Sequence, residues 1–427
     1  MAFHGFPCSH LPWRHACALD RTRLDTWHVF KLAVFLNWNF IATKLRVETE
    51  KRGCSTLSTF LESRFDDKSG LIRIITATII IFFMGCYLAA NLIGIGTVVE
   101  AVFGIDYTIA ITVAMFVAMI YSFVGGYYTV AKVDQFQALF LLFAIFLVPL
   151  ITYTHMPGGF QQVSKVARDN AIPMTLIGDS SWESIRSIIF LAMGWGLGYF
   201  GQPHIVTKFM GIKSPAELVK SKWVGMTWQV LALGFAAIVG FIGIGFFNAS
   251  LYDPQLVFVV MVKELFNPLI GGFILCGLIA ATLSTMDSQI IVSASVISED
   301  FWKYFVKKHA SDKELIWVSR LSVVALSFFS IYLAYSKNST VEKAVLYAWS
   351  GLGCSFGPAI IMALYDKKAN RHGAIAGIAI GGLIAGFWPS ILPYISSFDI
   401  PSMIPGFFAS ILTIYLVSRA YAPKVVA

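Results

Sequence analysis

Charged residues are scarce in this chain of 427 residues: Asp, Glu, Lys and Arg make up 13% of it, against about 25% in an average soluble domain. Hydrophobic residues make up 57%, which is more than a core with a wettable surface can hold. Cysteine is scarce too, and its six residues show no paired spacing, so neither a disulfide framework nor a zinc site is expected. The net charge of +8 comes from short clusters between apolar runs, which argues against a nucleic-acid partner. These shortages exclude a soluble enzyme and a secreted scaffold and predict a protein of the lipid bilayer.

Long apolar runs occupy most of the chain. A helix needs roughly 20 largely apolar residues to cross about 30 Å of hydrocarbon. Because the runs are continuous rather than alternating, they predict an all-α polytopic membrane protein and argue against a β-barrel. Ten stretches qualify as spans: 72–98, 107–127, 136–154, 184–204, 224–248, 269–297, 315–335, 343–365, 373–396 and 402–420. An eleventh, 29–43, is apolar but short, and we interpret it as the end of a helix whose beginning is absent.

The distribution of Lys and Arg predicts which way the spans run. Segment 44–71 carries six of these residues, and the next connection, 99–106, carries none. The alternation continues down the chain, and positively charged connections face the cytoplasm. We therefore expect every second connection, together with the C-terminus, on the cytoplasmic side of the membrane.

Residues 1–28 do not fit this pattern. They hold no apolar stretch and lack the features of a signal peptide. A metal site would need ligands in a recognised spacing. The candidate ligands, which show no such spacing, are His4, Cys8, His10, His15 and Cys17. We interpret the segment as a disordered leader, or as the product of a wrongly chosen start codon, ahead of a transmembrane domain at 29–427.

The stretch 193–204, MGWGLGYFGQPH, is rich in residues that weaken a helix, with four glycines and one proline. Secondary transporters bind substrates where membrane helices are broken. Trp195, Tyr199 and Pro203 recur every four residues and are expected on one face, where aromatic rings could hold a small zwitterion. The alternative is a closely packed helix interface, which small residues permit. The spacing alone does not decide between the two.

The stretch 280–289, AATLSTMDSQ, concentrates polar side chains inside a predicted span. The hydroxyls of Ser284 and Thr285, with the carbonyl of Ala281, could supply oxygens for a hard cation such as Na⁺. Alternatively, the hydroxyls bond carbonyls of their own helix. That alternative does not explain Asp287, since a carboxylate inside a membrane is costly and usually functional. We therefore favour an ion site.

Asp134 lies in the string VDQFQ, at the expected cytoplasmic start of the span 136–154. A carboxylate at a helix N-terminus is favoured by the helix dipole, so Asp134 could cap that helix. It could also line an exit path for an ion. From the sequence alone the cap is the better interpretation.

Together these segments resemble the sodium:solute symporter family, and most closely its sodium/proline branch. The resemblance covers about residues 30 to 425, almost the whole chain. The strings that carry it are RFDDKSGLIRII (64–75), MGWGLGYFGQPHI (193–205), LSTMDSQ (283–289), SEDFWK (298–303), HASDKELIWVSR (309–320), SFGPAI (355–360) and IPGF (404–407).

The resemblance implies a fold of two inverted five-helix repeats with alternating access around a central site. It also implies symport of L-proline, or of a similar small solute, driven by the sodium gradient. No enzymatic reaction and no cofactor are implied, because Na⁺ acts only as the coupling ion. The expected partners are the solute, Na⁺ and the bilayer, without nucleic acid or an obligate protein partner.

The resemblance also assigns residues. The family's sodium ligands match Ala281, Ser284 and Thr285, and the carboxylate on its sodium exit path matches Asp134. The substrate positions of the proline branch match Tyr87, Trp195, Tyr199 and Pro203.

Two departures from the family pattern stand out. Asp287 occupies a position where the proline branch has a small neutral residue, and we include it in the expected sodium site. The family's first two helices and the start of its third have no counterpart, so the chain resembles a member that is truncated at its N-terminus. Two alternatives to proline symport follow: a symporter for another small solute of the family, or a non-functional remnant.

Asp287 allows a direct test, because it stands three residues after Ser284 and so on the same side of a helix. Asp287→Asn removes a negative charge from the expected cation site. We expect the sodium dependence of uptake to weaken more than the apparent proline affinity at saturating sodium, measured as initial rates over a sodium series. Unchanged sodium dependence would show that Asp287 is not part of the cation site and has a structural role.

Overall fold

The computed structural model describes residues 32–170, 172, 174, 181–248, 251, 253–336, 340–396 and 398–421. The expected leader, residues 1–28, lies outside these residues, and so does the beginning of the stretch 29–43. Among the described residues all regular secondary structure is helical, and no strand occurs. The predicted all-α fold is therefore confirmed for this part of the chain.

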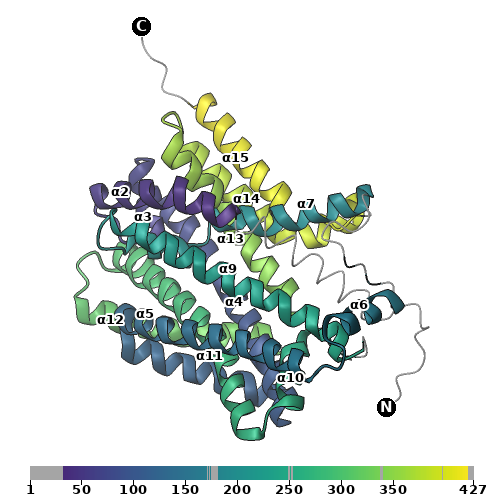
Figure 1. Cartoon of the computed structure of the whole chain (residues 1–427). Coiled ribbons are helices and arrows are strands. Elements are labelled where there is room, and N and C mark those ends of the chain that lie inside the picture. The colour runs from purple at the N-terminus through teal and green to yellow at the C-terminus, as the bar shows by residue number, and fades with distance from the viewer. Residues whose placement is uncertain are drawn as a thin grey trace. The chain divides into compact units, whose positions relative to one another are not determined.

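The α-helices are shown in Figure 1, and a helical segment at residues 32–36 precedes them. The π and 3₁₀ elements between them are written with the letter η. In the first half the helical elements are η1 Asn37–Ala42, α2 Thr43–Arg52, α3 Leu57–Arg64, α4 Leu71–Phe103, α5 Tyr107–His155, α6 Gly159–Asp169, α7 Trp182–Gly196, η2 Leu197–Phe200 and α8 Pro203–Met210. In the second half they are α9 Glu217–Phe246, η3 Pro254–Leu256, α10 Val257–Leu265, α11 Pro268–Ser295, η4 Val296–Val306, α12 Asp312–Ala334, α13 Val341–Tyr365, α14 Arg371–Ile395 and α15 Met403–Ala420.

Among the described residues, eight helical stretches are long and apolar enough to cross a membrane. They are Leu71–Phe103, Val130–His155, Glu217–Phe246, Pro268–Val306, Asp312–Ala334, Val341–Tyr365, Arg371–Ile395 and Met403–Ala420. Two shorter apolar helices, Tyr107–Ile120 and Ile185–Phe200, fall on the remaining predicted spans. Each of the ten predicted stretches thus coincides with an apolar helix.

The expected connection between the spans 107–127 and 136–154 is not formed as a loop. Tyr107–His155 is one helical element, α5. The connecting sequence, 128–135, contains neither proline nor glycine, so no residue in it breaks a helix. The prediction of a loop between these two spans was therefore wrong, because a short charged sequence is compatible with continued helix, whereas the two apolar stretches themselves are found, as Tyr107–Ile120 and Val130–His155.

The described helices divide into two compact units. One consists of residues 135–192 and 227–281. In its interior, α6 buries Val163, Val166 and Ala167, which share one helix face because their spacing is three and four residues. This face packs in one hydrophobic cluster with Ile244 of α9. α6 was not predicted, because a short amphipathic helix outside the spans has no long apolar run.

The other unit consists of residues 32–134, 193–226 and 282–427, and α13 forms the centre of its core. α13 packs against α4, α14, α15 and η2 (Figure 1). Glycines make these approaches close: a methyl group added at Gly351 would overlap the ring of Phe83, and one at Gly381 would overlap the carbonyl of Cys354. Small residues allow membrane helices to pack in this way without a hydrophobic driving force between them.

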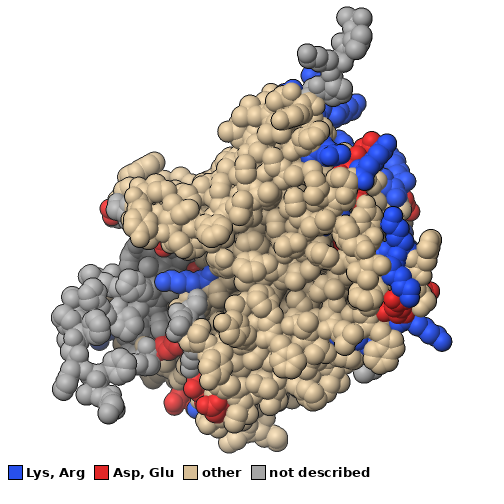
Figure 2. Space-filling view, turned by 180° about the vertical axis from the view of Figure 1, so that it is seen from behind, with Lys and Arg blue, Asp and Glu red and all other residues tan. Residues whose placement is uncertain are grey.

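The surface agrees with a membrane environment. Most of the face in Figure 2 carries neither acidic nor basic side chains, and Lys and Arg gather along one edge. Large apolar side chains of the spans are exposed, with Phe328 at 70% and Tyr394 at 90%. Such exposure is unfavourable in water and is expected of side chains that face lipid.

A buried carboxylate organises the connection between α3 and α4, outside the spans. Asp67 accepts hydrogen bonds from the backbone N–H of Ser69 at 3.0 Å, from the Ser69 hydroxyl at 2.6 Å and from the N–H of Ile72 at 2.8 Å. The guanidinium of Arg371 lies 3.5 Å away. Burial by itself raises the pKa of Asp67, but these hydrogen bonds and the nearby Arg371 outweigh it and hold the pKa below its ordinary value.

Asp67→Asn keeps the shape of this side chain but removes its charge. Because the folded-state pKa is lowered, the charge stabilises the fold above the ordinary value of 3.8, and this contribution is lost as the pH falls through the folded-state pKa. We expect the variant to lose about 1–3 kcal/mol at pH 7 and the difference from wild type to shrink toward pH 3. Thermal unfolding in detergent across this range checks it; a difference independent of pH would show that charge is not the cause.

Candidate functional site

The glycine-rich stretch 193–204 is broken, as its composition predicts. α7 ends at Gly196, a single 3₁₀ turn (η2) follows, and α8 begins with Pro203 at its first position. Proline is favoured there because the first N–H groups of a helix have no intrahelical partner. The continuous face expected for Trp195, Tyr199 and Pro203 is therefore not formed, since the four-residue spacing runs through the break.

The aromatic side chains of this stretch nevertheless meet, because they surround one tryptophan of α13. The ring of Trp349 lies 5.8 Å from Trp195, 5.4 Å from Tyr199 and 6.4 Å from Tyr87. Tyr87 also makes an edge contact, at 5.7 Å, with His204, the neighbour of Pro203. The four expected substrate residues or their neighbours thus belong to one aromatic cluster. Trp349 was missed in the sequence, where nothing distinguishes it from other tryptophans of the spans.

Hydrogen bonds join the broken stretch to α13. The indole N–H of Trp349 donates to the backbone carbonyl of Trp195 at 3.0 Å. The side-chain amide of Gln202 donates to the carbonyl of Trp349 at 2.9 Å. A methyl group at Gly201 would overlap the backbone nitrogen of Gly357. The stretch is therefore both broken and closely packed, so the packing interpretation holds without excluding a binding role.

Asp134 lies inside α5 and is not a helix cap, because the expected helix start does not exist. Its carboxylate instead accepts hydrogen bonds from α11: one from the hydroxyl of Ser284 at 2.5 Å and one from the hydroxyl of Ser288 at 3.5 Å. The ammonium of Lys208 lies 3.3 Å from the same carboxylate. The structure thus brings together two of the residues that the sequence analysis assigned to sodium, Asp134 and Ser284.

Asp287 stands next to these serines on α11, and its side chain is buried at 1% exposure. Neither of its carboxylate oxygens has a hydrogen-bond partner among the described residues. A buried carboxylate without partners is strongly disfavoured unless a cation or a proton compensates it. Ala281 and Thr285, the other expected ligands, lie on the same helix within two turns of Asp287.

The donor set suits a hard monovalent cation. Hydroxyl and carboxylate oxygens are the ligands that such ions prefer, whereas transition metals prefer imidazole or thiolate. No group of three or more His, Cys, Asp or Glu that could hold a metal ion occurs in the part of the chain that the structure describes. The site therefore combines few charges with several neutral oxygens.

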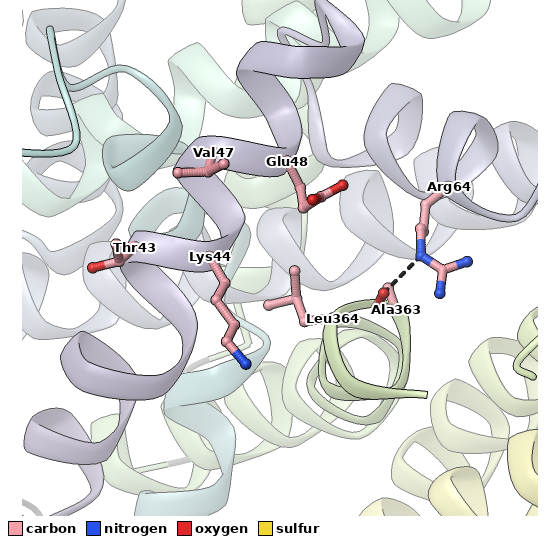
Figure 3. Close-up of a pocket in the computed structure, with 7 residues that line it drawn as sticks. All are labelled: Thr43, Lys44, Val47, Glu48, Arg64, Ala363 and Leu364. Carbon is pink, nitrogen blue, oxygen red and sulfur yellow. Dashed lines mark hydrogen bonds between the residues drawn. The ribbon is translucent and has the colours of Figure 1, made fainter. Parts of the chain in front are cut away.

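A cavity of about 420 Å³ lies elsewhere and shares no residue with these clusters. It is lined by Thr43, Lys44, Val47, Glu48, Arg64, Ala363 and Leu364 (Figure 3). In it, Arg64 points at the end of α13 and donates to the carbonyl of Ala363 at 2.7 Å (Figure 3). A cation at this place satisfies carbonyls at the C-terminus of a helix. Arg64 thus joins the end of α3 to the end of α13.

Comparison with known proteins decides the family. The family model described as "Sodium:solute symporter family" matches residues 26–381. The chain belongs to the sodium:solute symporter family. The resemblance inferred from the motifs is confirmed, and this family member is a multi-pass membrane transporter whose coupling ion is Na⁺.

Relatives with assigned substrates are close in sequence. The high-affinity proline transporter PutP of Bacillus subtilis (strain 168) is 35% identical over 391 residues, which cover 91% of this chain and 81% of that protein. The sodium/proline symporter of Escherichia coli (strain K12) is 36% identical over 393 residues, which cover 89% of this chain and 76% of that protein. These relatives are transporters and not enzymes.

A solved structure supports the fold. A Na⁺-coupled sialic acid symporter, in its substrate-bound outward-open state, superposes with a TM-score of 0.78, covering 97% of this chain and 88% of that one. The sequence identity is 16%, so the likeness concerns the fold alone.

Gly201 offers a test of the close packing. In Gly201→Ala the new methyl group would also come within 3.0 Å of the Cα of Gly353, where only backbone could give way. We expect a loss of about 1–3 kcal/mol, measured as a lower midpoint of thermal unfolding in detergent. Gly272→Ala is the matched control, since no described atom lies within 4 Å of its added methyl group, and it should not lower the midpoint. Equal effects of the two variants would contradict the argument.

Proposed function

We propose that the protein imports L-proline across the bacterial inner membrane together with Na⁺. The observation that carries the proposal is the polar cluster on α11, where the Ser284 hydroxyl is bonded to Asp134 and the neighbouring Asp287 carboxylate has no partner among the described residues. The printed names of the two bacterial relatives, which specify proline, support the choice of solute.

In this proposal Na⁺ binds oxygens of α11. Ser284, Thr285 and the carbonyl of Ala281 are the ligands, because their spacing of three to four residues puts them on neighbouring turns of one helix. Asp287 adds a negative charge to the same region. Asp134 lies on the exit path, where its carboxylate can receive the ion and its bond to Lys208 is exposed to exchange with water.

The solute binds at the aromatic cluster. Tyr87, Trp195 and Tyr199 present rings around Trp349, and apolar ring faces suit the pyrrolidine of proline. Pro203 begins α8 beside them, directly after the break in the helix, and secondary transporters bind substrates at such breaks.

Coupling needs no covalent step. If Na⁺ binds the outward-open form more tightly than the inward-open form, it shifts the population toward the form that accepts proline from outside. By thermodynamic reciprocity, proline then raises the affinity for Na⁺ by the same factor. The alternation of Lys and Arg between connections supports a C-terminus on the cytoplasmic side.

The alternative is that the protein transports another small solute of the family. Asp287 favours this alternative, because the proline branch has a small neutral residue at that position. None of the comparisons supports a non-functional remnant.

The test is uptake by the purified chain in proteoliposomes with an inward sodium gradient. We expect radiolabelled L-proline to accumulate above equilibrium and the accumulation to vanish when K⁺ replaces Na⁺. Ser284→Ala combined with Thr285→Ala should raise the half-saturating sodium concentration at least tenfold, because two proposed ligands are removed.

Ser322→Ala is the matched control. Its hydroxyl donates to the carbonyl of Val318 in its own helix at 2.7 Å, away from the proposed site. It should leave the sodium dependence unchanged. Proline uptake that does not depend on sodium would contradict sodium coupling. Sodium-driven uptake of a different solute in place of proline would favour the alternative solute.

A further inference from the structure

A pair of side-chain amides joins two helices of the second unit. Asn91 of α4 donates from Nδ2 to Oε1 of Gln289 of α11 at 3.0 Å. Asn91 is 8% exposed and Gln289 is fully buried. The amide nitrogen of Gln289 has no hydrogen-bond partner among the described residues.

This arrangement leaves both N–H donors of the Gln289 side chain unused. A buried N–H group without an acceptor is rare, because its desolvation is not compensated. Apolar side chains of similar size would join the two helices without that penalty. An unpaired amide inside a membrane helix is therefore expected to meet an acceptor during the working cycle.

The position of the pair indicates which acceptor. Gln289 stands four residues after Thr285 on α11, and Asn91 stands four residues after Tyr87 on α4. Four residues advance a helix by about 6 Å, so the amide pair lies one turn from a proposed sodium ligand and one turn from a proposed substrate residue. Tyr87 in turn belongs to the aromatic cluster around Trp349.

The chemistry of the proposed substrate indicates the acceptor for the Gln289 amide. A free amino acid carries a carboxylate, which needs N–H or O–H donors when it leaves water. The aromatic rings suit the apolar part of the solute and supply few donors. We propose that the side-chain N–H of Gln289 donates a hydrogen bond to the carboxylate of the transported amino acid, and that Asn91 is the positioning residue that orients it. This rests on the proposed function and adds a determinant of substrate class.

The experiment compares Gln289→Met with wild type in the proteoliposome assay at saturating sodium. Methionine has a similar length and no N–H donor. We expect the KM for proline to rise at least tenfold while the half-saturating sodium concentration stays within twofold. L-Prolinamide, which lacks the carboxylate, should compete poorly with proline in wild type, and this discrimination should shrink at least fivefold in the variant.

Asn91→Leu separates positioning from contact. Because Asn91 acts only through Gln289, we expect a smaller rise in KM, and the double variant should be no worse than Gln289→Met alone. Thr152→Val is the control: it removes a buried hydroxyl that donates to the carbonyl of Val148 within α5, and it should change neither quantity. Additive losses in the double variant would overturn the positioning role.

Proline binding to the detergent-solubilised chain, measured by calorimetry, tests the Gln289 contact separately from sodium-coupled transport. Wild type that binds proline without sodium-driven uptake would refute the proposed function, and the KM comparisons would then be made as Kd values. The proposed amide contact would be overturned if Gln289→Met had a KM or Kd for proline within twofold of wild type. It would also be overturned if the discrimination between L-proline and L-prolinamide stayed within twofold of wild type. If Gln289→Met does not fold, Gln289→Glu replaces it, because glutamate has the same size as glutamine. Glutamate repels a carboxylate, so this variant must weaken proline binding at least as strongly. Wild type that neither binds nor transports proline would refute both.

Discussion

The close approach of the broken stretch 196–202 to α13 is the contact on which the arrangement of the aromatic cluster depends. Gly198 and Gly201 have no side chains that could hold the two backbones apart. The side-chain amide of Gln202 therefore reaches the carbonyl of Trp349, and the indole N–H of Trp349 reaches the carbonyl of Trp195 just before the break. Once Trp349 is fixed by these hydrogen bonds, the rings of Trp195 and Tyr199 are placed against it. The break in the helix and its tight packing are thus two consequences of the same glycines, and the backbone of the break is held rigidly where a solute is proposed to bind.

The second constraint is electrostatic. A membrane span tolerates carboxylates only where something compensates them, and the region around α11 holds two. Asp134 is compensated by hydroxyls and by Lys208, whereas Asp287 is not compensated by any described side chain. A cation that enters this region would therefore compensate the charge of Asp287, whereas the charge of Asp134 is already compensated. This asymmetry would allow the proposed cation site to work without a cluster of charges, which would be costly in a low-dielectric interior.

The properties that could be predicted from the sequence are those set by local chemistry. Continuous apolar runs identified the spans because lipid selects composition directly, and glycine with proline identified the break at 196–203 because both act on their own backbone. Prediction failed where helix continuation depends on context, as at the junction inside α5, and where a short amphipathic helix such as α6 leaves no long run. Trp349 and the pair of Asn91 and Gln289 could not be found, since their partners lie far away in the sequence and only the packing of α4, α11 and α13 brings them together.

The order of residues along α11 connects ion and solute. Ser284, Thr285, Asp287, Ser288 and Gln289 all lie in the segment 284–289, which is less than two turns of a single helix. Within this segment the hydroxyls and the carboxylate suit a cation, while the last residue reaches α4 through its amide. A cation that reorients the segment must also move Gln289, because helical hydrogen bonds make the segment behave as one body. Differential binding of Na⁺ to two positions of the segment is then sufficient to change the affinity for a carboxylate at the proposed solute site, and the reciprocal effect of the solute on Na⁺ follows from the same free-energy cycle.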